Sequence, residues 1–145
     1  MSDFRKLRVW QETHELVLDS HRIATRMRGA GSVTLRDQIT RAVMSVSSNI
    51  VEGAAHESPK EFARFLRYAI GSVSEVEGHA QTAFDLGMIA EPDFTALLAR
   101  IIDVRKMLYG LLKKILRPGS GKAPTPNGER VQATGTGDEE TVSHT

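Results

Sequence analysis

Apolar residues recur at spacings of three and four along four stretches of the chain. This spacing places them on one face of an α-helix, because a helix has about 3.6 residues per turn. The pattern predicts helices over about 5–28, from 34 to about 53–56, over 59–86 and over 92–117. Their expected inward residues are Leu7, Trp10, His14, Val17, His21 and Ala24, flanked by Leu18 and Met27, in the first; Leu35, Ile39, Ala42, Val46 and Ile50 in the second; Phe62, Phe65, Leu66, Ala69, Val73, Val76, Ala80 and Ala83 in the third; and Leu97, Leu98, Ile101, Val104, Leu108, Leu111, Leu112 and Ile115 in the fourth.

The third helix has the clearest boundary signals. Ser58 can cap its N-terminus, Pro59 suits the first helical position, and Glu61 completes a capping box. Gly87 follows the last residue of the stripe, where a glycine commonly ends a helix. Pro118 stops the fourth helix.

The second helix has a weaker start signal. Thr34 and Asp37 stand three residues apart, as in a capping box, although Asp replaces the usual Glu. Gly29 and Gly31 interrupt the pattern before it, and Gly53 comes near its end. We expect all three glycines to lie in turns or at helix ends.

The connections between the helices are short, at about 29–34, 55–58 and 87–91. Short connections make consecutive helices antiparallel neighbours. The sequence therefore predicts an all-α, antiparallel up-down-up-down four-helix bundle over residues 1–118. Residues 119–145 are rich in Gly, Pro and Thr with almost no large apolar residue, so we expect them to form a disordered tail.

Composition narrows the function classes. The 145 residues include no Cys, which excludes a disulfide framework, thiolate zinc sites and a cysteine nucleophile. The polar N-terminus lacks the apolar run of a signal peptide, and no uncharged stretch approaches the roughly 20 residues of a membrane span. We expect a cytoplasmic protein without membrane contact.

Polar residues follow one face of the second helix at spacings typical of a core. They are Gln38, Arg41, Ser45, Asn49 and Glu52. The antiparallel third helix would bring Glu75 level with Arg41, and Arg64 near Glu52. The line has three interpretations: a hydrogen-bonded seam between helices or subunits, an exposed line, or a ligand or nucleic-acid site. The seam, with Glu75 as a member, is the interpretation that we favour.

The histidines do not predict a metal site. Glu52 with His56 and Glu75 with His79 are each spaced by four, but the two pairs lie roughly 30 Å apart along the hairpin. His14 and His21 lie two turns apart, which favours packing in the core or in an interface. No phosphate-binding glycine loop or nucleophile–base arrangement is present. We therefore expect no cofactor, no metal, no catalytic residue and no enzymatic activity.

Basic residues predict one candidate surface. The start of the first helix and the end of the fourth should share one end of the bundle, with Asp3 as a local counter-charge. The candidate nucleic-acid-binding residues there are Arg5, Lys6, Arg8, Lys113, Lys114 and Arg117. Arg22, Arg26 and Arg28 end the first helix at the other end. A solvated rim that complements the helix dipoles remains the alternative. The one aromatic residue that interleaves with these charges is Trp10, which we expect in the core. This argues against base stacking.

Several motifs resemble one family. They are 3–11 (Asp-Phe-Arg-Lys-Leu-Arg-Val-Trp-Gln), 38–42 (Gln-Ile-Thr-Arg-Ala) through Ser45, 48–53 (Ser-Asn-Ile-Val-Glu-Gly), 58–62 (Ser-Pro-Lys-Glu-Phe) through Phe65 and Leu66, 69–72 (Ala-Ile-Gly-Ser) and 75–77 (Glu-Val-Glu). Over about residues 3–117 the chain is similar to the four-helix-bundle proteins encoded in intervening sequences of 23S ribosomal RNA genes. These proteins resemble the accessory proteins of diversity-generating retroelements. Ser47 departs from the family, which usually has Pro there.

The resemblance implies an antiparallel four-helix bundle that assembles as a homopentamer. For the retroelement accessory proteins it implies binding to a reverse transcriptase and to nucleic acid through a basic surface. We therefore expect a non-catalytic, homo-oligomeric binding or scaffold protein, with RNA, DNA or a reverse transcriptase as candidate partners. The alternative is a purely structural, self-assembling bundle without a nucleic-acid role.

Overall fold

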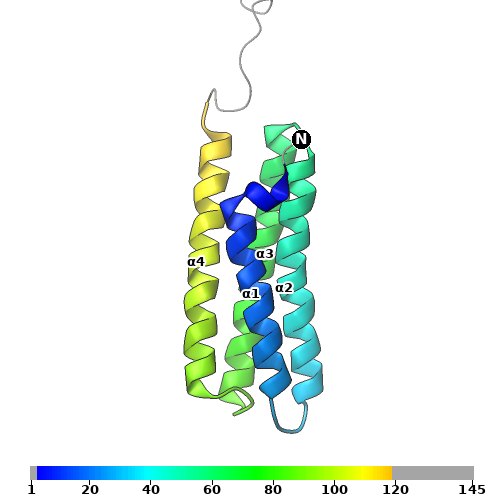
Figure 1. Ribbon diagram of the computed structural model, residues 1–145, viewed down its shortest axis with the longest axis vertical. Helices are drawn as coiled ribbons and strands as arrows, with labels where there is room; N and C mark the ends of the chain where they lie inside the picture. Colours follow the sequence, from blue (N-terminus) through cyan, green and yellow to red (C-terminus); the bar gives the residue numbers. More distant parts are fainter. Residues whose placement is uncertain (1–2, 119–145) are drawn as a thin grey trace, which may run out of the picture.

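The computed structural model describes residues 3–118, and these form an antiparallel four-helix bundle (Figure 1). A 3₁₀ turn, η1 (Phe4–Lys6), precedes the helices. The four helices are α1 (Arg8–Arg26), α2 (Ser32–Ala55), α3 (Pro59–Asp85) and α4 (Glu91–Leu116). This confirms the predicted fold class and the order of the helices. The expected disordered tail, residues 119–145, lies outside the described residues.

The first predicted helix is divided in two. Asp3 caps η1, since its Oδ1 accepts a hydrogen bond from the Arg5 backbone N–H at 3.1 Å. Leu7 is then extended, and α1 begins only at Arg8. The ring of Phe4 meets the ring of Trp10 edge to face, with centroids 5.1 Å apart, which fixes η1 across the start of α1.

The predicted capping box at Thr34 and Asp37 is wrong. Helix α2 begins two residues earlier, at Ser32, after Gly31 with a φ of 84° and without a side-chain cap. Gly29 also has a positive φ, of 104°. Two left-handed glycines turn the chain so tightly that the helix starts before Thr34 is reached.

The start and end of α3 agree with the sequence signals. The Ser58 hydroxyl accepts from the Glu61 backbone N–H at 3.3 Å, and Pro59 opens the helix. At the other end Gly87 has a φ of 76°, and the Met88 N–H donates to the Ala83 carbonyl at 2.8 Å. This is the hydrogen bond of a Schellman motif, which ends the helix.

The inward faces of α2, α3 and α4 agree with the prediction, but that of α1 agrees only in part. Its buried residues are Val9, Thr13, Leu16, Ser20, Ile23 and Ala24. Of the expected stripe, Ala24 and the flanking Met27 are buried, whereas Trp10 is half-buried and His21 and Leu18 are exposed. Two hydroxyl residues, Thr13 and Ser20, occupy the inward face, so the apolar pattern alone indicated the wrong centre.

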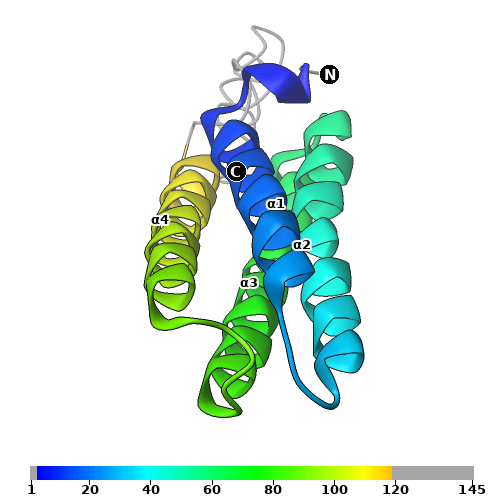
Figure 2. The same cartoon turned by 60° about the horizontal axis from the view of Figure 1, so that its bottom comes forward.

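Helices α2 and α3 share the most extensive contact in the bundle, and α1 and α4 the smallest. The connections α1–α2 and α3–α4 lie together at one end (Figure 2). The Arg28 backbone N–H donates there to the Met88 carbonyl at 3.3 Å. The other end therefore holds η1, the α2–α3 turn and the end of α4 (Figure 1).

Candidate nucleic-acid surface and polar seam

The six predicted basic residues are exposed and belong to segments that meet at one end of the bundle (Figure 1). We call this the basic end; its residues are Arg5, Lys6, Arg8, Lys113, Lys114 and Arg117. Helix α1 begins there and α4 ends there, as predicted. Asp3 counters Arg5, with Oδ1 and Nη1 3.2 Å apart. Within residues 3–118, Lys6, Arg8, Lys113 and Lys114 form no ion pair, so their charges face solvent.

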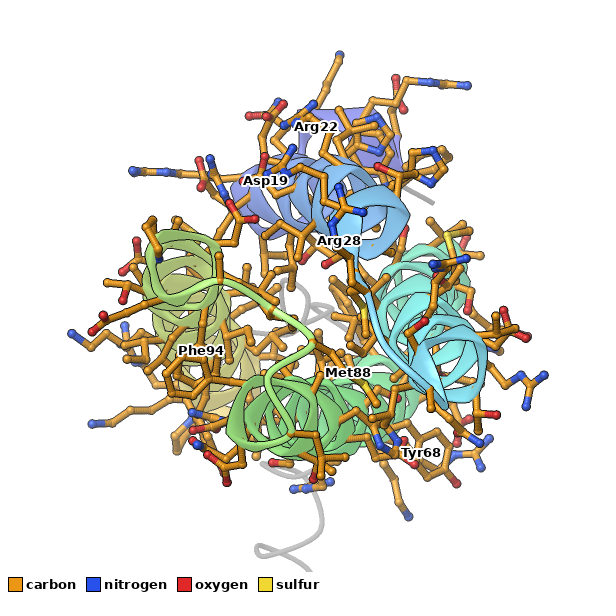
Figure 3. The ribbon with its side chains drawn as sticks, turned by 90° about the horizontal axis from the view of Figure 1, so that it is seen from below. Asp19, Arg22, Arg28, Tyr68, Met88 and Phe94 are labelled. Atoms are coloured by element: carbon orange, nitrogen blue, oxygen red, sulfur yellow. The ribbon has the colours of Figure 1, made fainter. Side chains whose placement is uncertain are left out.

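Two of the three arginines named at the opposite end are paired with carboxylates, and Arg28 forms no ion pair within residues 3–118. Arg22 forms an ion pair with Asp19 on the outer side of α1 (Figure 3). Arg26 Nη2 lies 2.9 Å from Asp93 Oδ1 of α4. The hydrogen bond to Asp93 and its charge raise the pKa of Arg26. The two ends thus differ: cations are unpaired where α1 begins and are mostly neutralised where it ends.

Helix α3 adds cations near the basic end that were not among the predicted residues. Lys60, Arg64 and Arg67 are exposed on its first turns. Arg64 Nη2 lies 2.9 Å from Glu61 Oε1, and its Nη1 donates to the Tyr68 hydroxyl at 3.1 Å. The hydrogen bond to Glu61 raises the pKa of Arg64 most, and the hydrogen bond to Tyr68 raises it further. The sequence did contain a signal for this second group of cations, since basic and aromatic residues are interspersed at 64–68, Arg-Phe-Leu-Arg-Tyr.

The polar line of α2 divides into two parts. Gln38, Arg41, Ser45 and Glu75 line an open pocket of about 220 Å³ between α2 and α3, together with Ala42 and His79. The predicted height of Glu75 opposite Arg41 is therefore correct. Within the described part of the chain, however, these two side chains do not form an ion pair, and both are exposed.

The middle of the line is a hydrogen-bonded seam between helices. The Oγ atoms of Ser45 and Ser72 lie 2.8 Å apart, which joins α2 to α3. Asn49 Nδ2 donates to the Ser45 carbonyl at 2.8 Å and to its Oγ at 3.2 Å. Ser72, which was not among the predicted seam residues, is the buried partner, with 6% of its surface exposed.

Glu52 lies outside this seam, and its predicted neighbour is wrong. Arg64 pairs with Glu61 on its own helix instead. Glu52 lines an open, mainly apolar hollow of about 540 Å³ on the outer face of α2. We call this the α2 hollow; its other residues are Met44, Ser47, Ser48, Val51, Ala55 and His56.

Ion pairs connect α1 to α4, the neighbouring helices with the least extensive contact. Arg100 Nε lies 2.7 Å from Asp19 Oδ2, and its Nη1 lies 3.6 Å from Glu12 Oε1. These side chains are one quarter to one third exposed. A charged network therefore fixes the position of α1 beside α4.

The histidines lie in different environments. His14 stacks on Trp10 with ring centroids 4.7 Å apart, while His21 is exposed in the single chain. His56 and His79 line different pockets. Across residues 3–118, no three His, Asp or Glu side chains gather closely enough to hold a metal ion. None of the four helices is both long and apolar enough to cross a membrane, over the same range.

Comparisons with known proteins give one family and one fold. The family model described as 23S rRNA-intervening sequence protein matches residues 5–110. A crystal structure of a protein of unknown function from the S23 ribosomal protein family of Bacteroides thetaiotaomicron is similar, with a TM-score of 0.65 and 17% sequence identity. The similarity covers 72% of this chain and 98% of that chain. No curated protein matches in sequence.

Proposed function

The chain belongs to the 23S rRNA-intervening sequence protein family, and from this premise we propose that it is a homo-oligomeric binding protein whose basic end holds the phosphate backbone of RNA or DNA. The proposed role is binding without catalysis. It would act in the cytoplasm, where nucleic acid is accessible.

The contrast between the two ends of the bundle carries this proposal. Four cations of the basic end have no carboxylate partner among residues 3–118, whereas Arg22 and Arg26 at the other end are paired. Unpaired cations gain most from phosphate, because binding releases the counterions of the nucleic acid without breaking an existing ion pair. A rim that served only the helix dipole would need cations on α4 alone, yet η1 and α1 also supply them.

Self-assembly is supported by the outer face of α2. The α2 hollow is mainly apolar, and Met44 within it is 50% exposed. Small residues such as Ser47 and Ser48 would let a second copy approach closely. We propose that the part of this face around Met44, Ser47 and Ser48 lies between subunits, with His56 left outside the contact, and that the oligomer is the homopentamer that the family resemblance implies. Five copies of the basic end would convert weak phosphate contacts into firm binding.

We further propose a reverse transcriptase as the protein partner, on the expectation that this family is related to the accessory proteins of diversity-generating retroelements. The same apolar face of α2 also favours a second candidate function, a purely structural assembly protein without nucleic-acid contact. The two candidates differ in one observable, which is salt-sensitive binding to RNA or DNA.

Filter binding of labelled RNA and DNA at 50 mM and 200 mM salt tests the proposal. Lys113→Gln with Lys114→Gln should weaken binding and lower the slope of log affinity against log salt by roughly 0.7–0.9 for each phosphate that is no longer neutralised. Arg22→Gln with Arg28→Gln removes the same charge from the other end and is the control. Absence of salt-sensitive binding would leave the structural candidate, and a monomeric mass in solution would refute the assembly.

A further inference from the structure

Three rings and a guanidinium form a cluster at the corner where α2 turns into α3. The ring of His56 stacks on Phe65 with centroids 5.3 Å apart and planes 13° apart. The ring of Tyr68 meets Phe65 at 5.7 Å and 89°. We call these residues, together with Arg64, the ring cluster. They come from the end of α2 and from the first three turns of α3.

Arg64 holds the ring cluster in one arrangement. Its guanidinium carbon lies 5.0 Å from the Phe65 centroid and 5.6 Å from the Tyr68 centroid. Its Nη1 donates to the Tyr68 hydroxyl at 3.1 Å, while Glu61 accepts two further hydrogen bonds from it. The rings are therefore oriented before any ligand arrives, which lowers the entropy that binding would cost.

Burial does not account for the outer members of the ring cluster. Tyr68 is 48% exposed and lies on the outer side of α3, away from the bundle axis (Figure 3). His56 is exposed, and only Phe65 is half-buried. The core is complete without Tyr68 and His56, because neither belongs to the buried residues or to those packed against them.

Further cations lie on the same turns of α3 as the ring cluster, which shares its end of the molecule with the basic end. Lys60 and Arg67 are exposed on the same turns of α3. The turn η1, which carries Arg5 and Lys6, contacts α2, whose end leads into His56. The α2–α3 turn and the end of α4 lie at the same end of the molecule (Figure 1). An extended ligand on the basic end could therefore reach the rings along this end of the molecule.

We infer that the ring cluster is a stacking site for an unpaired nucleobase, and that the ligand of the basic end contains a single-stranded segment of RNA or DNA. Aromatic faces within a cationic surface are how proteins hold single strands, since every base offers a face for stacking. The cations argue against an apolar protein segment as the occupant. This inference rests on the proposed function, because phosphate contacts deliver the strand to the rings.

Two 12-nucleotide probes separate base stacking from phosphate contact: oligothymidylate, and an abasic strand of the same length and charge. The full chain should bind oligothymidylate more tightly than the abasic strand. Tyr68→Leu and, separately, His56→Ala should each weaken oligothymidylate binding at least about fivefold and leave abasic binding unchanged. Tyr109→Leu makes the same change at an exposed tyrosine outside the cluster, and it should have no such effect.

The outcomes are distinct. Equal affinity for the two probes would overturn the stacking site but leave phosphate binding intact, whereas binding of neither probe would overturn the proposed function as well. Tighter binding of duplex than of single strand would also contradict the inference. A third probe, 12-nucleotide oligouridylate, is compared with oligothymidylate to determine whether the site prefers RNA or DNA. Thermal unfolding of each variant verifies that it is folded.

Discussion

The hydroxyl oxygens of Ser45 and Ser72 lie 2.8 Å apart across the contact between α2 and α3. Asn49 donates a further hydrogen bond to the Ser45 hydroxyl at 3.2 Å. A polar line on the sequence of α2 thus continues into the interior and ends on a buried residue of α3. It is a satisfied network of the single chain, which does not need a second subunit to complete it.

Ser72→Ala should destabilise the protein by about 1 kcal/mol, because the Ser45 hydroxyl loses its partner on α3. The double variant with Ser45→Ala should cost less than the sum of the two single variants, since both remove the same hydrogen bond. Urea unfolding followed by circular dichroism measures both quantities. Ser74→Ala, at an exposed position of the same helix, is the control and should stay within about 0.5 kcal/mol. Strictly additive costs would contradict the network.

Gly53→Ala should destabilise the bundle although alanine is the better helix former. A Cβ at this position would lie 2.9 Å from Phe62 Cδ1 and 2.9 Å from Phe65 Cβ. Phe65 Cβ cannot move away by a change of rotamer, so the helices must separate. Overpacking of this kind costs about 1–3 kcal/mol, which exceeds the gain in helix propensity of about 1 kcal/mol.

Gly78→Ala is the matched control for that variant. Gly78 also lies within a helix, but beyond the neighbouring backbone of that helix nothing lies within 4 Å of the position of its added Cβ. This variant should therefore be more stable than the parent by about 0.5–1 kcal/mol. Differential scanning calorimetry of both variants measures whether each substitution raises or lowers the unfolding temperature. Stabilisation by both substitutions would show that α2 and α3 do not require a glycine at position 53.

Arg100→Gln should weaken the attachment of α1 to α4. Arg100 pairs with Asp19 and Glu12, and all three side chains are partly shielded from solvent. The expected cost is about 1 kcal/mol at low salt, and it should shrink at 1 M NaCl, where the Debye length is about 3 Å. Lys106→Gln, an exposed change on the same helix, is the control. A cost that does not depend on salt would indicate poorer packing of the arginine stem instead.

The apolar stripes of α2, α3 and α4 were sufficient to predict the fold, because aliphatic residues fill the inward positions of those helices. Helix α1 was harder to interpret. Its inward face includes Thr13 and Ser20, whose hydroxyl oxygens are buried without a hydrogen-bond partner among the described residues. A pattern of hydrophobicity assigns such positions to the surface and therefore rotates the predicted face toward Trp10 and His21.

The parts of the candidate site that depend on helix order could be predicted from the sequence. The ion pairs and ring contacts between individual side chains could not. Helix order alone places the start of α1 beside the end of α4, and the structure agrees. Arg64 was instead assigned to Glu52, although Glu61 one turn earlier on its own helix is the nearer carboxylate. The ring cluster was missed because its members come from two helices, so no single helical face contains them all.

The placement of η1 and of the end of α4 on one end of the bundle has a practical consequence for labelling. An affinity tag or fusion partner joined directly to Asp3, or to Pro118 in a chain cut there, would emerge over the basic end and compete for the surface under study. The α1–α2 connection lies at the far end, where Ala30 is exposed. Since the chain has no cysteine, Ala30→Cys would accept a single fluorophore or surface anchor and leave the opposite end unobstructed.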